Sequence, residues 1–341
     1  MVNEKLAELV KTSKPSVAVV GLGGAGCNIT TWIAEKGMAG GRIIAANTDV
    51  NHLSTMSKAD KLILLGEKLC KGHGCGGYPE MGSQATKENL AEIKAELEGT
   101  NLVFLVAGLG GGTGTGAIPV VAEVTREIGA LTIACVTIPF KIEQFRREKA
   151  REAIVALSES CDSTIVIDNS KLREVAGNLP LKEALAVANA LVGAFVKNIT
   201  ETITQPSLIN LDYADLRAVM ERGGISSIGI GEGDGEDRVV KAVSQALAVP
   251  LLDISDMSAT YGVLIHIVGG EDMTLEEVAV VGERIVEKMP DTKHVIWGAR
   301  VDSSLTGRVR IMAVLTGIKS PSLKVSENGI KNCYHPLLIP G

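Results

Sequence analysis

The chain has 341 residues, of which 45% are hydrophobic and 22% are charged, proportions that are ordinary for a globular protein. This length is sufficient for two domains. The formal net charge of -6 gives no broad basic surface, so the composition excludes a protein that binds nucleic acid through nonspecific attraction to phosphate. An anionic small ligand would therefore need local donors.

Hydropathy predicts neither a membrane span nor a secretory signal. The longest apolar stretch, 184–196, contains Asn189 and is shorter than the roughly 20 residues that a spanning helix needs, so we interpret it as a buried helix. The N-terminus MVNEKLAELVKTSK lacks the apolar segment of a signal peptide. We expect a cytoplasmic protein without direct membrane insertion.

The six cysteines are scattered without CxxC pairs, as expected of reduced core thiols. Cys70, His73 and Cys75 lie close enough in sequence to offer three metal ligands, but no fourth ligand is evident. Because the segment LCKGHGCGGYP is rich in glycine, a glycine-rich loop is favoured over a zinc site, and no protein metal site is predicted.

From residue 16 to 168, short apolar runs alternate with helical patterns. Helices are expected to start near residues 27, 82, 115, 145 and 181, and strands are expected at 16–20, 42–47, 62–65, 102–107, 131–138 and 163–167. Continuous β-branched hydrophobicity is typical of strands covered on both faces by helices. The pattern predicts an α/β fold with a doubly wound parallel sheet, whose ligands bind outside the carboxyl ends of the strands.

The second half of the chain predicts a smaller α+β domain. A long central helix is expected over 181–205, after which Pro206 breaks the pattern before a new helix begins. Further strands are expected at 227–231, 262–268, 294–301 and 308–316, and helices at 236–248 and 274–288. We therefore divide the chain into an extension (1–15), a first domain (16–180), the central helix (181–205), a loop and helix (206–224), a second domain (225–318) and a tail (319–341).

A first glycine-rich turn, Gly21–Gly26, follows a strand and opens a helix. Its sequence GLGGAG matches GxGxxG, in which backbone amides and a helix N-terminus can approach anionic oxygens. Taken alone, this turn predicts a dinucleotide, and Asp49 lies where a Rossmann domain places its ribose carboxylate. The alternative is a tight turn needed only for packing the helix on the strand.

A second turn, Gly108–Gly116, contains six glycines in nine residues. Glycine destabilises ordered backbone, so this density predicts positive φ values and amides that converge on a ligand, with Thr113 and Thr115 as hydroxyl donors or helix caps. A dehydrogenase needs only one such loop. No GxxxxGK[ST] motif is present, so phosphate charge would be neutralised by amides, the helix dipole, a cation or Arg147.

The sequence GGGTGTG after a parallel strand resembles the tubulin/FtsZ superfamily, and most closely its FtsZ branch. The motifs GLGGAGCN, NTD, GGYP, GLGGGTGTG, TIPFKIEQFRR, IDNSKL and NLDYADLRAVM occur in that family's order across about residues 16–318. The resemblance implies a GTPase that polymerises head to tail into protofilaments, usually for cell division. Its ligand would be GTP or GDP, with Mg²⁺ held mainly through the phosphates.

The resemblance also implies the residues that bind the nucleotide. The two glycine turns would contribute Gly23, Gly24, Ala25, Gly26, Cys27 and Asn28, then Gly108, Gly110, Gly111, Gly112, Thr113, Gly114, Thr115 and Gly116. The other implied contacts are Asn47 and Asp49 beside the phosphates, Gly76 and Gly77 near the γ-phosphate, Glu143 on the ribose, Arg147, and Asn169 on ribose or base. Purely structural alternatives also exist: Glu143 and Arg147 could form a surface ion pair, and Asn28 could be a local helix cap.

Two positions depart from the family pattern where the base would lie. Leu185 and Asn189 stand in the central helix where the family usually has Phe and Asp. Leucine stacks less well on a base, and an Asn amide accepts only one of the two guanine hydrogens that a carboxylate accepts. The resemblance therefore implies GTP with weakened guanine selectivity.

The motif NLDYADLRAVM contains Asn210, Asp212 and Asp215. From spacing alone, Asn210 or Asp212 would simply cap the following helix. The resemblance implies instead that this loop enters the nucleotide site of the next subunit and orients the water that attacks the γ-phosphate. An isolated monomer should then be nearly inactive, because phosphoryl transfer depends on positioning and charge stabilisation.

Two other functions stay open. GxGxxG and Asp49 would suit a nicotinamide-dependent oxidoreductase, which the second glycine turn opposes. The changes at Leu185 and Asn189 are compatible with a filament-forming regulator that has weak GTP turnover. The presence of Asn210, Asp212 and Asp215 argues against this alternative. The tail, which ends in HPLLIPG, would either bind a membrane tether or pack on its own domain.

Overall fold

The strands of both halves of the described chain form one sheet, in the order β3-β2-β1-β4-β5-β6-β7-β10-β8-β9. The computed structural model describes residues 14–55, 58–205, 211–221, 223–248, 251–254, 257 and 260–323. The sheet therefore has ten strands within these residues.

The first half of the sheet is wholly parallel, as the sequence predicts. Its strands are β1 (Val17–Leu22), β2 (Gly41–Asn47), β3 (Lys61–Leu64), β4 (Leu102–Gly108), β5 (Leu131–Ile138) and β6 (Ser163–Asp168). Every residue of β1, β5 and β6 is buried. Burial on both faces explains the nearly unbroken hydrophobicity of these segments.

The helices of this half are α2 (Gly23–Lys36), α3 (Val50–Leu53), α4 (Glu67–Cys70), α5 (Pro79–Glu88), α6 (Leu90–Leu97), α7 (Thr113–Glu127), α8 (Gln144–Ser160) and α9 (Leu172–Ala176), with a 3₁₀ turn at Asn169–Lys171. The sequence placed the starts of α2, α5 and α7 too late. The first turn of α2 has three glycines in four residues, and the first turn of α7 alternates threonine and glycine, which have low helix propensity. These first turns nevertheless carry the free amides of the helix N-termini.

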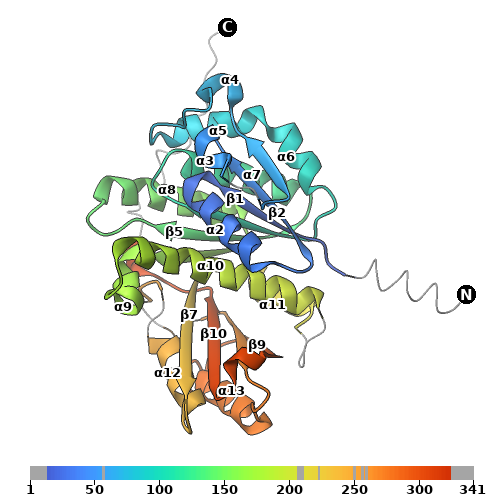
Figure 1. The fold of residues 1–341 in the computed structure, drawn as a ribbon, viewed down its shortest axis with the longest axis vertical. Coiled ribbons are helices and arrows are strands. Elements are labelled where there is room, and N and C mark those ends of the chain that lie inside the picture. The colour runs from blue at the N-terminus through green and yellow to red at the C-terminus, as the bar shows by residue number, and fades with distance from the viewer. Residues whose placement is uncertain are drawn as a thin grey trace, which may run out of the picture.

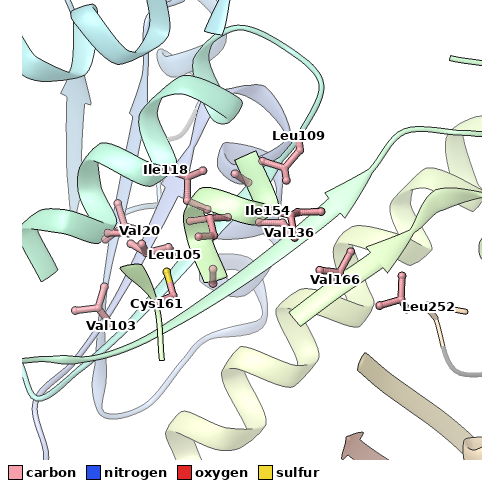
Figure 2. Close-up of a cluster of buried hydrophobic side chains, with 14 of the residues drawn as sticks. Val20, Val103, Leu105, Leu109, Ile118, Val136, Ile154, Cys161, Val166 and Leu252 are labelled. Carbon is pink, nitrogen blue, oxygen red and sulfur yellow. The ribbon is translucent and has the colours of Figure 1, made fainter. Parts of the chain in front are cut away.

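Helices cover both faces of the parallel strands. Figure 2 shows one side of the core, where Ile118 of α7 and Ile154 of α8 lie among Val20, Leu105 and Val136 of the sheet. On the opposite face of the sheet lie α2 and the long helix α10 (Leu181–Thr204). They pack on the strand residues that alternate with those of the first face, such as Val19 and Phe104. There Phe104 of β4 meets Phe195 of α10 edge to face, with ring centroids 5.9 Å apart.

The long helix α10 crosses the middle of the molecule, from α9 to α11 (Tyr213–Met220) (Figure 1). A Cβ atom on Gly193 would lie 2.4 Å from the Trp32 ring of α2, so only glycine permits this close packing. Near its end, Thr202 lies 3.2 Å from Nε2 of His266, and Glu201 pairs with Arg300. The end of α10 is thus joined to the second half of the sheet.

The second half comprises β7 (Gly224–Asp234), α12 (Arg238–Ala248), β8 (Gly262–Gly269), α13 (Leu275–Lys288), β9 (His294–Val301) and β10 (Arg308–Thr316), with 3₁₀ turns at Ser303–Leu305 and Pro321–Leu323. β7 pairs in parallel with β6, while β10 lies antiparallel between β7 and β8. The expected α+β composition is confirmed, but these strands extend the first sheet. The exact domain boundaries stay a prediction.

Candidate nucleotide site

A cavity of about 320 Å³ lies at the carboxyl ends of β1, β4, β5 and β6. Its lining consists of Gly24, Ala25, Gly108, Leu109, Gly111, Gly112, Thr113, Gly114, Thr137, Pro139, Glu143, Arg146 and Asn169. This is the edge of a doubly wound sheet at which ligands bind. Leu109, Thr137, Pro139 and Arg146 were not predicted, although Thr137 and Pro139 could have been found because they adjoin a strand's carboxyl end.

Two helix N-termini meet at this cavity. α2 begins at Gly23 and α7 at Thr113, and a Cβ atom on Gly23 would lie 2.7 Å from the amide nitrogen of Gly114. The unpaired amides and the positive dipole ends of both helices favour an anion between them. The cavity therefore has the character of a phosphate site.

The glycines of the second turn serve two different purposes. Only Gly110 has a positive φ, of 95°, so the prediction of several positive φ values was wrong. A Cβ atom on Gly114 would approach the Gly108 carbonyl oxygen to 2.8 Å, and one on Gly116 would approach the Pro79 oxygen to 1.9 Å. These glycines permit close backbone packing. At Gly111 a Cβ atom would meet nothing within 4 Å, so packing does not explain that glycine.

The first turn also combines packing with ligand access. A Cβ atom on Gly26 would lie 2.3 Å from the Val106 oxygen, so the packing alternative holds for this residue. Gly24 and Ala25 line the cavity, whereas Gly23, Gly26, Cys27 and Asn28 do not appear in its lining. Asn28 is exposed on α2, and Cys27 is buried with its thiol directed to the Ala46 oxygen.

Threonine hydroxyls connect the second turn to its surroundings. Thr115 accepts a hydrogen bond from the Gly110 amide at 2.9 Å, and Thr113 lies 2.6 Å from the Thr48 hydroxyl. Asn47 accepts from the Thr48 amide, and Asp49 accepts from the amides that open α3. Asn47 and Asp49 therefore shape the segment behind the cavity and do not line it.

The glycine-rich loop at 71–77 packs against the second turn. The Cys75 thiol donates to the Thr48 hydroxyl at 3.4 Å and lies 3.8 Å from the sulfur of Cys70. Burial, with a further contribution from Cys75, raises the pKa of Cys70 to about 11. His73 is exposed while both thiols are buried, so the three side chains do not converge. Within the described ranges, no three His, Cys, Asp or Glu residues could hold a metal.

The remaining loop glycines and cysteines have structural surroundings. Gly76 and Gly77 have φ values of 55° and 84° and lie outside the cavity lining, and the Gly77 oxygen accepts from Lys149 at 2.7 Å. All five described cysteines are free and buried, which confirms for them the prediction of reduced core thiols. Cys333 lies outside the described residues.

The alternative of a surface ion pair between Glu143 and Arg147 does not hold. Glu143 accepts from Arg146 at 2.9 Å and from the Phe140 amide at 3.1 Å. Arg147 is buried and donates to both carboxylate oxygens of Asp168, at 3.0 and 2.9 Å. Burial tends to raise the pKa of Asp168, but Arg147 and the Ser170 amide hold that pKa below its usual value. Two consecutive helical side chains point about 100° apart, and only the structure shows which one lines the cavity.

Asn169 provides a polar group with no protein partner. It lines the cavity, and its buried Oδ1 atom has no hydrogen-bond partner among the described residues. An unpaired buried acceptor costs about 1–3 kcal/mol, so a ligand donor at this position would be stabilising. Leu185 and Asn189 lie on α10 and are absent from the lining.

The acidic motif lies at the opposite end of the sheet, where β4 begins. Asp212 caps α11 in a reciprocal capping box with Asp215, which confirms the capping interpretation for Asp212, while Asn210 lies outside the described residues. The hydroxyl of Tyr213 donates to the oxygen of Asn101, which precedes β4. β4 separates this end from Gly108 by about 20 Å, at about 3.3 Å per residue. Asp212 and Asp215 therefore lie far from the cavity of their own chain.

Comparison with known proteins decides which family has this arrangement. Residues 16–177 match the GTPase domain of the tubulin/FtsZ family, and residues 224–319 match the C-terminal domain of the FtsZ family. The chain is 48% identical over 310 residues to cell division protein FtsZ 2 of Methanocaldococcus jannaschii, covering 90% of this chain and 81% of that protein. The chain belongs to the tubulin/FtsZ family. As an FtsZ-type protein, it is a GTP-binding, GTP-hydrolysing cytoskeletal protein of cell division.

Further relatives agree with this assignment. Cell division protein FtsZ 1 of Archaeoglobus fulgidus is 45% identical over 323 residues, covering 94% of this chain and 87% of that protein. The solved structure "FtsZ dimer, empty" of M. jannaschii superposes with a TM-score of 0.87 at 43% identity, covering 96% of this chain and 98% of that one. These relatives exclude the alternative that the chain is a nicotinamide-dependent oxidoreductase.

None of the helices in the described segments combines the length and the apolar character required to cross a bilayer. This holds for α10, which the hydropathy pattern assigned to the protein interior. Its side chains Val192, Phe195, Val196 and Ile199 are fully buried.

Proposed function

We propose that the cavity binds GTP with its phosphates at the N-termini of α2 and α7, and that Asp212 and Asp215 of a second copy complete the hydrolytic site. Amides of Gly111, Gly112 and Gly114 would hold phosphate oxygens, and Asn169 would pair with the ribose or base. These roles fit the residues that line the cavity. Copies would accordingly assemble head to tail, as in a homopolymer.

One observation carries the proposal of a shared site. Glu143 is the single carboxylate in the described lining of the cavity, and both of its oxygens already accept hydrogen bonds. Its carboxylate is therefore held against Arg146 and the Phe140 amide. The described carboxylates of the acidic motif lie at the other edge of the sheet, about 20 Å away along β4, where only another copy could use them.

Mg²⁺ would be held mainly through the phosphates of the nucleotide. No group of three potential metal ligands occurs in the part of the chain that the structure describes. Asp49, the carboxylate nearest in sequence to Thr48, already caps α3 through Oδ1. The ion would supply charge neutralisation between the phosphates, while this chain's amides position them.

The variant Asp212→Asn tests the shared site without removing the helix cap. Asparagine caps helices as well as aspartate does, so folding and GTP affinity should stay unchanged while kcat falls by about 10². Asp212→Ala, which also loses the cap, should in addition lose about 1 kcal/mol of stability. Phosphate release and urea unfolding would be measured for both.

The protein-concentration series provides the decisive control. Specific GTPase activity of the unmodified chain should rise steeply with concentration, because a second copy must supply the acidic motif. Constant specific activity, or an Asp212→Asn variant with full kcat, would overturn the shared site. Saturable GTP binding and filaments with negligible turnover at every concentration would favour the regulator.

Location and tethering follow from the family and are part of the proposal. Filaments of this protein would act at the division site, as the names of the cell-division relatives suggest. The tail proposed to bind a membrane tether falls almost wholly outside the described residues. Fusing residues 319–341 to a fluorescent protein and asking whether the fusion moves to the division site would test it.

A further inference from the structure

We propose that Tyr213 is a positioning residue for GTP hydrolysis. By bonding to the first half of the sheet, its hydroxyl sets where Asp212 and Asp215 stand when they reach the cavity of the next copy. Tyr213 lies between the two carboxylates in the sequence, at the first position of α11. The inference rests on the proposed shared site and adds a residue to it.

The two carboxylates are fixed relative to their own helix by the capping box. The Asp215 amide donates to Asp212 at 2.7 Å, and the Asp212 amide donates to Asp215 at 3.4 Å. Each bond uses one oxygen of a carboxylate, and both side chains are exposed, so the second oxygens are accessible to a water. The capping box does not fix the helix relative to the sheet, because all of its atoms belong to residues 212–215.

The later part of α11 follows the second half of the sheet. The helix packs against β8 and β9, and a Cβ atom on Gly262, the first residue of β8, would lie 3.2 Å from Cγ1 of Val219. Leu216, Val219 and Met220 are fully buried. Apolar contacts of this kind are non-directional, so they hold the helix down without setting the exact position of its first turn.

The Tyr213 hydroxyl ties that first turn to the first half of the sheet. It donates to the Asn101 oxygen at 2.9 Å, and hydrogen bonds are directional. Asn101 is itself held firmly, because its oxygen also accepts from the Leu131 amide at 2.8 Å and its amide and side chain both pair with Ser16. A carbonyl oxygen has two lone pairs, so it serves both donors.

The position of Asn101 links this hydrogen bond to hydrolysis. Asn101 immediately precedes β4, whose other end, Gly108, lines the cavity. The hydroxyl therefore connects the carboxylates of a copy to the strand that carries the proposed phosphate loop of the same copy. In a head-to-tail row, the distance from a cavity to the carboxylates of its own chain decides where those carboxylates arrive in the neighbouring cavity. A loosened first turn would misplace them, and catalysis is sensitive to such displacements.

The variant Tyr213→Phe tests this role, because it removes the hydroxyl and keeps the ring. At a protein concentration where specific activity has reached its plateau, kcat should fall by about three- to tenfold, the factor that corresponds to one neutral hydrogen bond. GTP affinity and the amount of sedimented filament should stay unchanged, and the melting temperature should fall by about 2 °C at most. Tyr261→Phe is the matched control: it removes the hydroxyl of a ring beside His294, outside α11 and the cavity lining, and should keep full kcat.

A mixing measurement separates positioning from a general loss of structure. Tyr213→Phe is combined with an excess of chains that carry Gly111→Ala, a change in the proposed phosphate loop that leaves the acidic motif intact. Nearly every Tyr213→Phe cavity then receives a normal motif from its neighbour. After subtraction of the turnover of the Gly111→Ala chains alone, turnover per Tyr213→Phe copy should return to the unmodified value. An excess of Asp212→Asn chains should not restore it.

The outcomes separate this inference from the proposed function. Unchanged kcat in Tyr213→Phe, or a loss that Gly111→Ala chains do not restore, would overturn the positioning role while leaving the shared site in place. Full kcat in Asp212→Asn would remove the shared site itself, and this inference with it.

Discussion

At the scale of single residues, the second glycine turn combines positions fixed by packing with a position that packing leaves free. A side chain at Gly116 would collide with the Pro79 oxygen, whereas one at Gly111 would meet no protein atom within 4 Å. Both are simply glycine in the sequence. Gly116 is therefore required for packing of the loop, whereas Gly111 is free to serve a ligand.

Two alanine substitutions should therefore have opposite effects. Gly111→Ala should keep the free energy of unfolding within about 1 kcal/mol but weaken GTP binding, because the added methyl group projects where protein atoms are absent. Gly116→Ala should lose about 1–3 kcal/mol of stability through overpacking. Urea unfolding and GTP titration would check both, and equal losses of stability would contradict this assignment.

The sequence could locate the loops of the site but not the direction of each side chain. Glycine-rich turns after apolar runs predicted where phosphate-binding amides would gather, and Gly24, Thr113 and Asn169 do line the cavity. Which of Arg146 and Arg147 faces the cavity depends on the buried Asp168, which is 21 residues away from Arg147 in the sequence. Such a contact is set by tertiary packing.

At the scale of elements, α10 joins the second half of the sheet through a buried histidine. His266 of β8 lies 3.2 Å from Thr202, and its Nδ1 atom has no hydrogen-bond partner in the described chain. Burial lowers the pKa of His266 to about 4; Arg300 adds to this shift and Glu201 opposes it. The folded protein therefore holds this imidazole in its neutral form.

Stability should fall when the solution is acidified below pH 6.5. An unfolded histidine binds a proton near pH 6.5, so between there and about pH 4 the unfolded state holds the extra proton and is favoured. The full loss approaches roughly 3 kcal/mol. In His266→Gln this part of the pH dependence should disappear. Urea unfolding at intervals from pH 7.5 to 4.5 would measure it, and parallel curves for the two proteins would refute the assignment.

Strands were more predictable than helix ends, for a physical reason. β5 spans Leu131–Ile138 as expected because every one of its residues is buried and hydrophobic packing alone defines it. The start of α7 is defined by loop geometry at Thr113, where glycine and threonine give no helical periodicity. The break between α5 and α6 depends on Asn89, whose side chain accepts from the distant Gly66 amide.

At the scale of the whole molecule, the cavity and the described acidic residues occupy opposite edges of one sheet. A mixture of two defective variants should consequently regain activity. Asp212→Asn keeps an intact cavity, and Gly111→Ala keeps intact carboxylates, so random head-to-tail contacts in an equal mixture should restore about a quarter of the normal turnover. Phosphate release from the mixture would be compared with either variant alone.

The control for this mixture is a chain carrying both substitutions. Added to either single variant, it cannot create a contact between an intact cavity and an intact Asp212, so turnover should stay at the background level. Recovery with this double variant, or none in the first mixture, would contradict completion of the site between copies.

If Asp212 completes the cavity of a neighbouring copy, as proposed, the two ends of every head-to-tail row of copies differ. A row of n copies contains n cavities but completes only n − 1 of them, since one terminal cavity has no neighbour to supply carboxylates. A dimer can turn over one of its two nucleotides, while a long row turns over nearly all. The terminal copy would thus keep its triphosphate longest, so the two ends of the row would differ in the nucleotide that they carry.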